Sequence, residues 1–135
     1  MNEILDNFKI VLALSGGVLG WIFGGFNSLI YALIAFVVID YFTGVLLAIY
    51  EKKLSSNIGF KGISKKVMMF ALVALGNIID QHIIGSGSSL RTMLIMFYLS
   101  NEGISIIENA GKMGLPLPQK LKDVIQQLNG NNDKK

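Results

Sequence analysis

The chain contains no cysteine, a single histidine and only two prolines. The absence of cysteine excludes disulfides, thiolate metal sites and cysteine nucleophiles together, and it removes redox chemistry as a guide to the compartment. The lone His82 is typical of a solvated group at the end of a helix rather than of a metal ligand. No Ser-His-Asp arrangement, HExxH motif or phosphate-binding loop stands out either. We therefore expect no enzyme activity and no metal or other cofactor.

Charged residues are also scarce, at 16% of the chain, whereas 52% of the residues are hydrophobic. This balance is unusual for a soluble domain and is typical of a membrane protein. The net charge of +3 comes from lysines that cluster beside apolar runs, without interleaved aromatic residues. Nucleic-acid binding is therefore not expected. Glu3 and Asp6 near the start are unlike a secretory signal, so we expect no cleavage there.

The first apolar stretch is long enough for two membrane-spanning helices. Residues 10–39 carry no charge, and the apolar character continues to Tyr50. A spanning helix needs about 20 residues, and the stretch is interrupted at residues 24–28. Glycines there can leave the helical conformation, and Asn27 or Ser28 can cap a new helix. The sequence predicts helices near residues 10–25 and 28–50. Alternatively, the first segment lies in the interface or re-enters, which leaves three spans.

Two further apolar helices follow a polar connection. Residues 51–66 hold five lysines, two glycines and three serines, and they are predicted to be a loop. Residues 67–79 are predicted to form the third helix, with a Gly/Ser turn at 85–89 before a fourth helix at 90–110. Gly111, Gly114, Pro116 and Pro118 then end that helix.

A short amphipathic helix is predicted after Pro118, because Leu121, Val124, Ile125 and Leu128 recur at i, i+3, i+4 and i+7. Such a helix lies on a membrane surface or associates with another copy. The polar tail at residues 129–135 is expected to be disordered. The fold class is thus an all-α integral membrane protein, with a transmembrane domain at residues 1–111 and a cytoplasmic amphipathic helix and tail at 112–135.

Basic residues set the expected orientation. Five lie in residues 51–66 and five in residues 112–135, whereas Arg91 is alone in the connection between the third and fourth helices. The positive-inside rule places the first two segments in the cytoplasm. With four spans the N-terminus is cytoplasmic too, and with three it is outside. The lysines that carry this argument in the loop are Lys52, Lys53, Lys61, Lys65 and Lys66.

Glycines in the first helix form a possible packing surface. Gly16, Gly20 and Gly24 recur every four residues, a spacing that lets another helix backbone approach closely in lipid. We interpret them as a packing face, with chance spacing as the alternative.

Polar residues form a stripe down the fourth helix at i, i+3, i+4 and i+7 spacing. At a rise of 1.5 Å per residue, Glu102 lies about 18 Å from the outer end of the fourth helix. Asp40 on the second helix lies at the same depth, and Asn77 on the third helix lies near it. No basic residue is expected at that level. These residues either bond the helices together or form a face that becomes wet when subunits assemble. Glu108 is expected to pair with Lys112 instead. The stripe consists of Tyr98, Asn101, Glu102, Ser105, Glu108 and Asn109.

Two long segments of the chain are DYFTGVLLAIYEKKLSSNIGFKGISKKV, from Asp40, and FYLSNEGISIIENAGKMGLPLPQKLKDVI, from Phe97. In this order, they resemble the phage-lysis and toxin-secretion holin family of Gram-positive bacteria and their phages. The matching positions are Asp40, Thr43, Gly44, Leu54, Ser55, Ser56, Gly59, Gly62, Lys65, Lys66, Glu102, Ser105, Glu108, Asn109, Gly114, Pro116 and Pro118.

The resemblance implies a small protein of the cytoplasmic membrane that forms homo-oligomers and opens lesions. Its partners would be membrane lipids and other copies of itself. A cell-wall hydrolase (endolysin) or a toxin would pass through the lesions without necessarily binding. Two alternatives from other classes stay open: a small ion or proton channel, and a membrane adaptor that binds a partner through the C-terminal helix.

Overall fold

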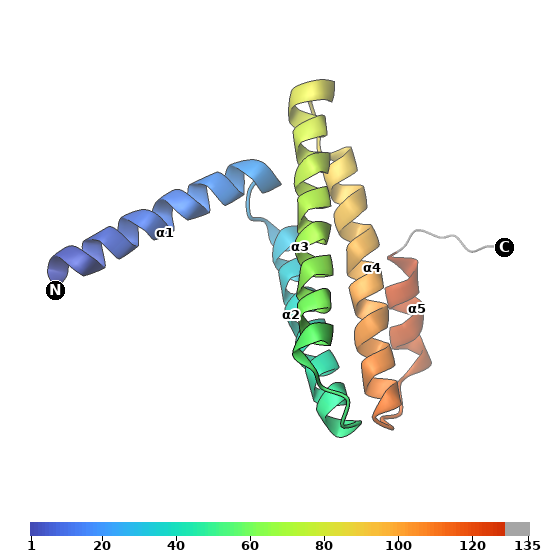
Figure 1. Cartoon of the computed structure of the whole chain (residues 1–135). Coiled ribbons are helices and arrows are strands. Elements are labelled where there is room, and N and C mark those ends of the chain that lie inside the picture. Colours follow the sequence, from blue (N-terminus) through green and yellow to red (C-terminus); the bar gives the residue numbers. More distant parts are fainter. Residues whose placement is uncertain (129–135) are drawn as a thin grey trace.

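The computed structural model describes residues 1–128 and consists of helices over that range. Helices α2, α3 and α4 form a bundle in which α3 runs antiparallel to both α2 and α4, α5 lies along α4, and α1 leaves the bundle sideways (Figure 1). The predicted tail at residues 129–135 lies outside the described residues. The helices are α1 (Asn2–Phe23), α2 (Ser28–Tyr50), α3 (Ser56–Ile78), the π-helix η1 (Ile79–Ile84), α4 (Ser89–Lys112) and α5 (Gln119–Gln127).

The chain is an all-α membrane protein, as its composition predicts. By length and composition, three helices of residues 1–128 could cross a membrane: α1, α2 and the continuous helix Ser56–Ile84. Helix α4 is as long as these and packs between them and α5, but its polar stripe makes it less apolar. The predicted bounds of α2 and α4 are confirmed to within two residues.

Local hydrogen bonds explain where α2 and α3 begin. The Asn27 side chain accepts a hydrogen bond from the Ile30 N–H at 3.2 Å, and Ser55 Oγ accepts one from the Ile58 N–H at 3.2 Å. Both are N-caps, which satisfy amide groups that have no partner inside the helix. The predicted role of Asn27 as a cap is confirmed.

The predicted loop at residues 51–66 is wrong in its second half, because α3 begins at Ser56. Lysine is a good helix former, and the Ser55 cap outweighs Gly59 and Gly62 inside the helix. Helix α1 also starts earlier than expected, at Asn2 rather than near residue 10. In both cases the first turns of the helix are polar, and they were therefore predicted to lie outside it. Hydropathy indicates which residues are buried in lipid, but it does not indicate where a helix begins.

The core lies between α2, α3 and α4. A close approach of α3 and α4 occurs at Gly76, where an added Cβ would lie 2.6 Å from Leu94 Cδ1 and 3.4 Å from the Arg91 backbone nitrogen. A side chain there would have to displace the Leu94 side chain, which packs against Gly76, and it would touch the backbone of α4. The buried apolar residues that pack together are Ile30, Leu33, Met69, Val73, Ile95 and Leu99.

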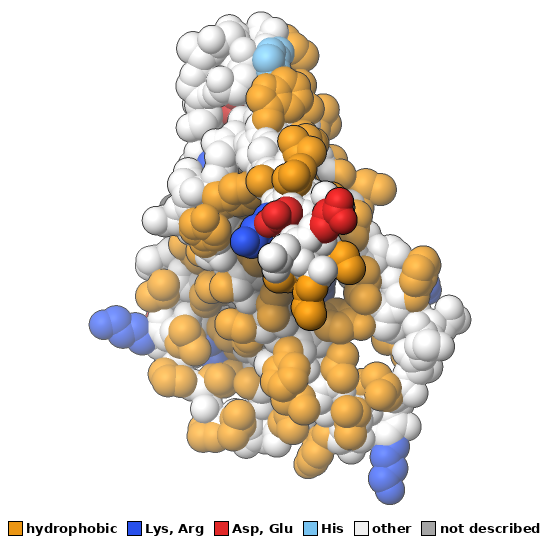
Figure 2. Space-filling model, turned by 90° about the vertical axis from the view of Figure 1, so that its left-hand side faces the viewer, with side chains coloured by type: hydrophobic (Ala, Val, Ile, Leu, Met, Phe, Trp, Pro, Cys, Tyr) orange, Lys and Arg blue, Asp and Glu red, His pale blue; other side chains and the backbone are white. Residues whose placement is uncertain are grey.

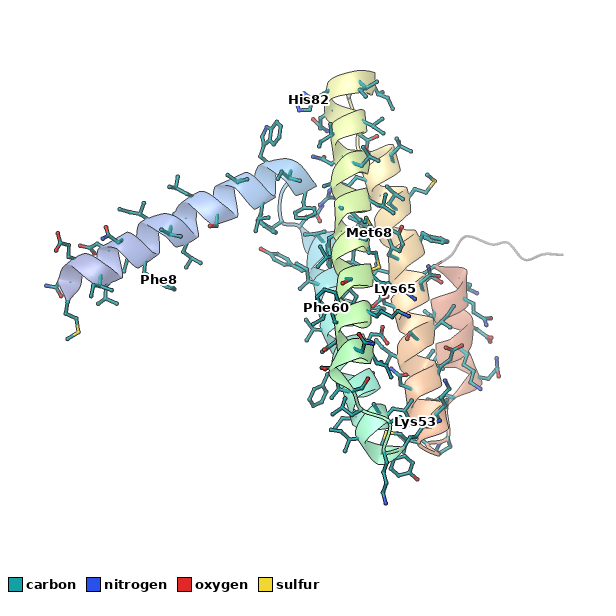
Figure 3. The ribbon with its side chains drawn as sticks, in the orientation of Figure 1. Phe8, Lys53, Phe60, Lys65, Met68 and His82 are labelled. Atoms are coloured by element: carbon teal, nitrogen blue, oxygen red, sulfur yellow. The ribbon has the colours of Figure 1, made fainter. Side chains whose placement is uncertain are left out.

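Helix α1 has no buried residue, and its apolar side chains surround it on all sides. Figure 2 looks along α1 onto the face of the bundle from which it projects: the near end of α1 carries acidic and basic side chains, and hydrophobic side chains are spread over the face around it. Phe8 on α1 and Phe60 on α3 both point away from the bundle (Figure 3).

The predicted glycine ridge is only partly helical. Gly24 is not part of α1: it is the C-cap, with φ of 81°, a left-handed conformation that favours glycine. Nothing lies within 4 Å of a Cβ added at Gly16, whereas one added at Gly20 would touch Phe26 at 3.4 Å. A packing role for Gly16 and Gly20 against a second helix therefore stays a prediction.

Candidate functional site

The central feature of the bundle is a lysine held between two carboxylates from different helices. Lys66 Nζ of α3 lies 2.7 Å from Asp40 Oδ2 of α2 and 2.7 Å from Glu102 Oε1 of α4. Asp40 is 7% exposed and Glu102 is 8% exposed. One cation thus ties all three helices of the bundle together.

The expectation that no basic residue lies level with Asp40 and Glu102 is therefore wrong. It followed from placing Lys66 in a loop. Because α3 starts at Ser56, Lys66 is ten residues into the helix, about 15 Å along its axis. The long side chain then reaches the two carboxylates from inside the bundle.

Neighbouring polar groups complete the hydrogen bonding of Asp40. Asn109 Nδ2 donates to Asp40 Oδ1 at 3.2 Å and to Thr43 Oγ1 at 2.9 Å. Thr43 Oγ1 in turn donates to the Asp40 carbonyl oxygen at 3.1 Å. Buried ion pairs are stable only when such bonds offset the loss of hydration. We call Asp40, Thr43, Lys66, Glu102 and Asn109 the ionic cluster.

A cavity of about 220 Å³ adjoins the ionic cluster, between α2, α3 and α4. On α3 the cavity is lined by Gly59 and Gly62, which carry no side chain that could fill it. A Cβ added at Gly59 would lie 3.2 Å from Tyr41 Oη. This volume is enough for several water molecules. Most of the lining is apolar, but Asp40, Lys66, Ser105 and Asn109 offer hydrogen-bond partners to such waters. Ser105 of the predicted stripe also lines the cavity.

A second polar cluster lies where α1 joins the bundle. Asn77 Nδ2 donates to the Ile22 carbonyl at 2.9 Å and to the Trp21 carbonyl at 3.3 Å. Arg91, which is 3% exposed, donates to the Phe23 carbonyl and to the Gly25 carbonyl at 3.1 Å. These bonds satisfy carbonyls at the C-terminal end of α1, which lack partners within the helix.

The structure therefore separates Asn77 from Asp40 and Glu102, contrary to the predicted common level. Asn77 is eleven residues beyond Lys66 on α3, about 16 Å further along the axis. The depth estimate failed because it counted α3 from Lys66 rather than from Ser56.

Comparison with known proteins places this arrangement in a family. The sequence profile of the bacteriophage holin family matches residues 17–130, which include both polar clusters. The chain belongs to the bacteriophage holin family. Its membership explains the apolar helices, and this family is one of membrane proteins rather than of enzymes.

Relatives of similar length support the assignment of this holin-family chain. An uncharacterized 14.9 kDa protein from the region 3′ of nagH in Clostridium perfringens is 36% identical over 96% of this chain and 98% of its own. An uncharacterized protein of Listeria innocua is 44% identical over 87% of this chain and 83% of its own. The uncharacterized protein YqxH of Bacillus subtilis is 34% identical over 80% of this chain and 76% of its own. No solved structure matches this holin-family chain.

The predicted stripe of this holin-family protein divides into two faces. Glu102, Ser105 and Asn109 point into the bundle, and Tyr98 packs beside the apolar core. Asn101 and Glu108 are exposed. The expected ion pair of Glu108 with Lys112 is wrong, because the ion pairs formed within residues 1–128 are the two that Lys66 makes.

The topology lysines of this holin-family protein also divide by position. Lys53 lies at the lower end of the bundle and Lys65 lies higher on α3 (Figure 3). Both are exposed, as are Lys52 and Lys61, whereas Lys66 points inward. The five lysines thus differ only in where they lie on the structure: four are on the surface, and one is part of the ionic cluster.

Three buried polar residues were missed by sequence reasoning: Asp80, Arg91 and Ser100. Arg91 was counted only for orientation, and no role was expected for Asp80 or Ser100. Asp80 is 1% exposed and accepts hydrogen bonds from the N–H groups of Leu90 at 3.2 Å and Arg91 at 2.9 Å, so it caps α4 from another helix. His82 is exposed, with its ring 5.4 Å from that of Trp21.

Proposed function

We propose that this holin-family protein forms homo-oligomers in the bacterial cytoplasmic membrane and opens lesions there. Through these a cell-wall hydrolase leaves the cytoplasm during phage lysis, or a toxin leaves it during secretion. The observation that carries the proposal is Lys66, which holds Asp40 and Glu102 inside the closed bundle. Family membership supports the same function.

The ionic cluster suggests how a closed bundle and an open lesion are related. While α2, α3 and α4 stay together, Lys66 and the carboxylates satisfy each other away from lipid. Separating the helices in hydrocarbon would expose each charge at about 2.5 to 3.5 kcal/mol on insertion scales. The helices separate at lower free energy when water or polar groups of other copies replace the lost partners, so opening is coupled to assembly.

The distribution of basic residues supports an orientation. The α2–α3 connection with the start of α3 (residues 51–65) and the C-terminal segment (residues 112–135) would lie on the cytoplasmic side, because nine of the twelve basic residues lie there. In this arrangement residues 1–111 form the membrane domain, and residues 112–135 begin at its cytoplasmic end. The hydrolase or toxin would pass through the lesion without a specific binding site.

A small ion or proton channel is the second candidate function. The observation that favours it is the cavity lined by Asp40 and Lys66, since intramembrane carboxylates commonly mark ion or proton pathways. A membrane adaptor that binds a partner through α5 would require no conductance.

Release from liposomes separates these functions. Purified protein is reconstituted with a trapped fluorescent dye and a trapped dextran of protein size. Lesion formation predicts release of both markers, a channel predicts ion flux with both markers retained, and an adaptor predicts no flux. Retention of the dextran at protein densities where copies crosslink would contradict the proposed function.

A further inference from the structure

Helix α5 folds back along α4 and is fixed at the middle of the bundle (Figure 1). Ser100 Oγ donates a hydrogen bond to the Ile125 carbonyl at 3.1 Å, and Ile125 is 8% exposed. A Cβ added at Gly103 would lie 2.9 Å from Ile125 Cδ1 and 3.3 Å from Phe36 Cε2. Ile125 thus fills a notch that exists because residue 103 has no side chain.

The position of this notch along α4 sets the depth of α5. Ser100 is near the midpoint of Ser89–Lys112, about 17 Å from either end. The hydrocarbon layer of a membrane is about 30 Å thick. Exposed apolar side chains run the length of α2, from Tyr31 to Ile49, so the layer covers the bundle from end to end. A docked α5 therefore reaches the depth of the membrane centre.

The outer side of α5 is too polar for lipid at that depth. Helix α2, by contrast, exposes no charged or amide side chain anywhere in Ser28–Tyr50. Charged and amide groups are seldom found against lipid, and they face water or other protein groups instead. The exposed polar residues of α5 are Gln119, Lys120, Asp123, Gln126 and Gln127.

We propose that α5 stays docked on α4 in the membrane, and that its polar side is the water-facing wall of the bundle. Lipid then contacts α2, and in a ring of copies α5 lines the aqueous opening, reached from the end where α4 and α5 connect. This inference rests on the proposed function only for insertion of the bundle in a membrane.

A disulfide tests whether α5 stays docked, because the natural chain has no cysteine. Gly103→Cys with Ile125→Cys brings two Cβ atoms within disulfide range, and the smaller side chain at 125 makes room for the one at 103. Gly103→Cys with Val124→Cys is the matched control, because Val124 is 47% exposed on α5. In phosphatidylethanolamine/phosphatidylglycerol liposomes we expect the first pair to oxidise at least about tenfold faster. Equal rates would show that α5 leaves α4, and would overturn the proposal.

Spin labels test which medium the wall faces. A single label at Gln126→Cys reports α5, and one at Val38→Cys, 60% exposed on α2, is the control at a similar depth. We expect collisions with a water-soluble nickel chelate to be several-fold more frequent at residue 126, and collisions with oxygen to be more frequent at residue 38. A label at residue 126 that behaves like the one at residue 38 would overturn the proposal.

The same liposomes distinguish this inference from the proposed function. Fast crosslinking and a water-accessible label at residue 126 support a docked wet wall whether or not the trapped dextran escapes. Retention of dextran under those conditions would refute lesion formation alone. Escape of dextran with a lipid-exposed residue 126 would refute the wall alone.

Discussion

Lys66 Nζ lies 2.7 Å from Glu102 Oε1, although 36 residues separate them in the sequence. The same ammonium group lies 2.7 Å from Asp40 Oδ2 on the remaining helix of the bundle. Removing a single partner from such a buried cluster leaves charges without compensation, and the consequence can be measured.

Replacing Lys66 with methionine should destabilise the bundle strongly. Two buried carboxylates would lose their cation, and breaking a buried ion pair from one side typically costs about 3 to 5 kcal/mol. Unfolding followed by circular dichroism as sodium dodecyl sulfate is added to a mild detergent would measure the change. Lys65→Met, at the exposed neighbouring position, should shift the transition by no more than about 0.5 kcal/mol. Equal transitions for the two variants would show that the cluster contributes little.

Glu102→Gln and Glu102→Leu should change the onset of permeabilisation to different extents. Glutamine keeps an oxygen that accepts from Lys66, but a neutral acceptor binds an ammonium group more weakly than a carboxylate does. We expect earlier onset for Gln than for wild type at matched membrane abundance. Leucine should loosen the bundle further, by about 0.6 to 2 kcal/mol per lost bond. A Gln variant indistinguishable from wild type, beside an altered Leu variant, would reduce Glu102 to a packing role.

Gly76→Ala should disturb the packing of α4 against α3, because the Leu94 side chain must move to make room for the new methyl group. The added methyl group would lie 2.6 Å from Leu94 Cδ1, and overpacking of this kind costs about 1 to 3 kcal/mol. Gly16→Ala is the control, because nothing lies within 4 Å of its added Cβ. In a detergent unfolding assay we expect a lower midpoint for Gly76→Ala and an unchanged or higher midpoint for Gly16→Ala. Equal effects would mean that α3 and α4 do not approach closely at Gly76.

Single cysteines at the two ends of the continuous helix Ser56–Ile84 should report its orientation. Under the proposed topology, Ser56→Cys resists a membrane-impermeant thiol reagent in intact cells that have not yet lysed. Ser86→Cys, in the connection before α4, should react readily. The opposite pattern would invert the topology, and labelling at both positions would show that the helix does not span the membrane.

The sequence was sufficient to predict the class of fold and most helix bounds. Long uncharged runs, the Asn27 cap and the glycines and prolines after residue 110 act locally, so their effects can be read from neighbouring residues. The polar stripe on the fourth helix and the amphipathic character of α5 were also predicted from periodicity. The resemblance to a holin family rested on residues quoted directly from the chain, and the family match confirmed it.

Only the tertiary structure decided how polar residues pair. In the sequence, Lys66 cannot be distinguished from the surface lysines around it. The start of α3 at Ser56 determines which side of the helix each lysine lies on, and only Lys66 lies on the side that faces the bundle. Asn77 and Arg91 bind backbone carbonyl groups at the end of α1. Every residue has such a group, so the sequence does not indicate which carbonyls are bound. Local preferences determined the helices, whereas contacts between distant segments, whose partners depend on helix packing, determined the ionic cluster and the position of α5.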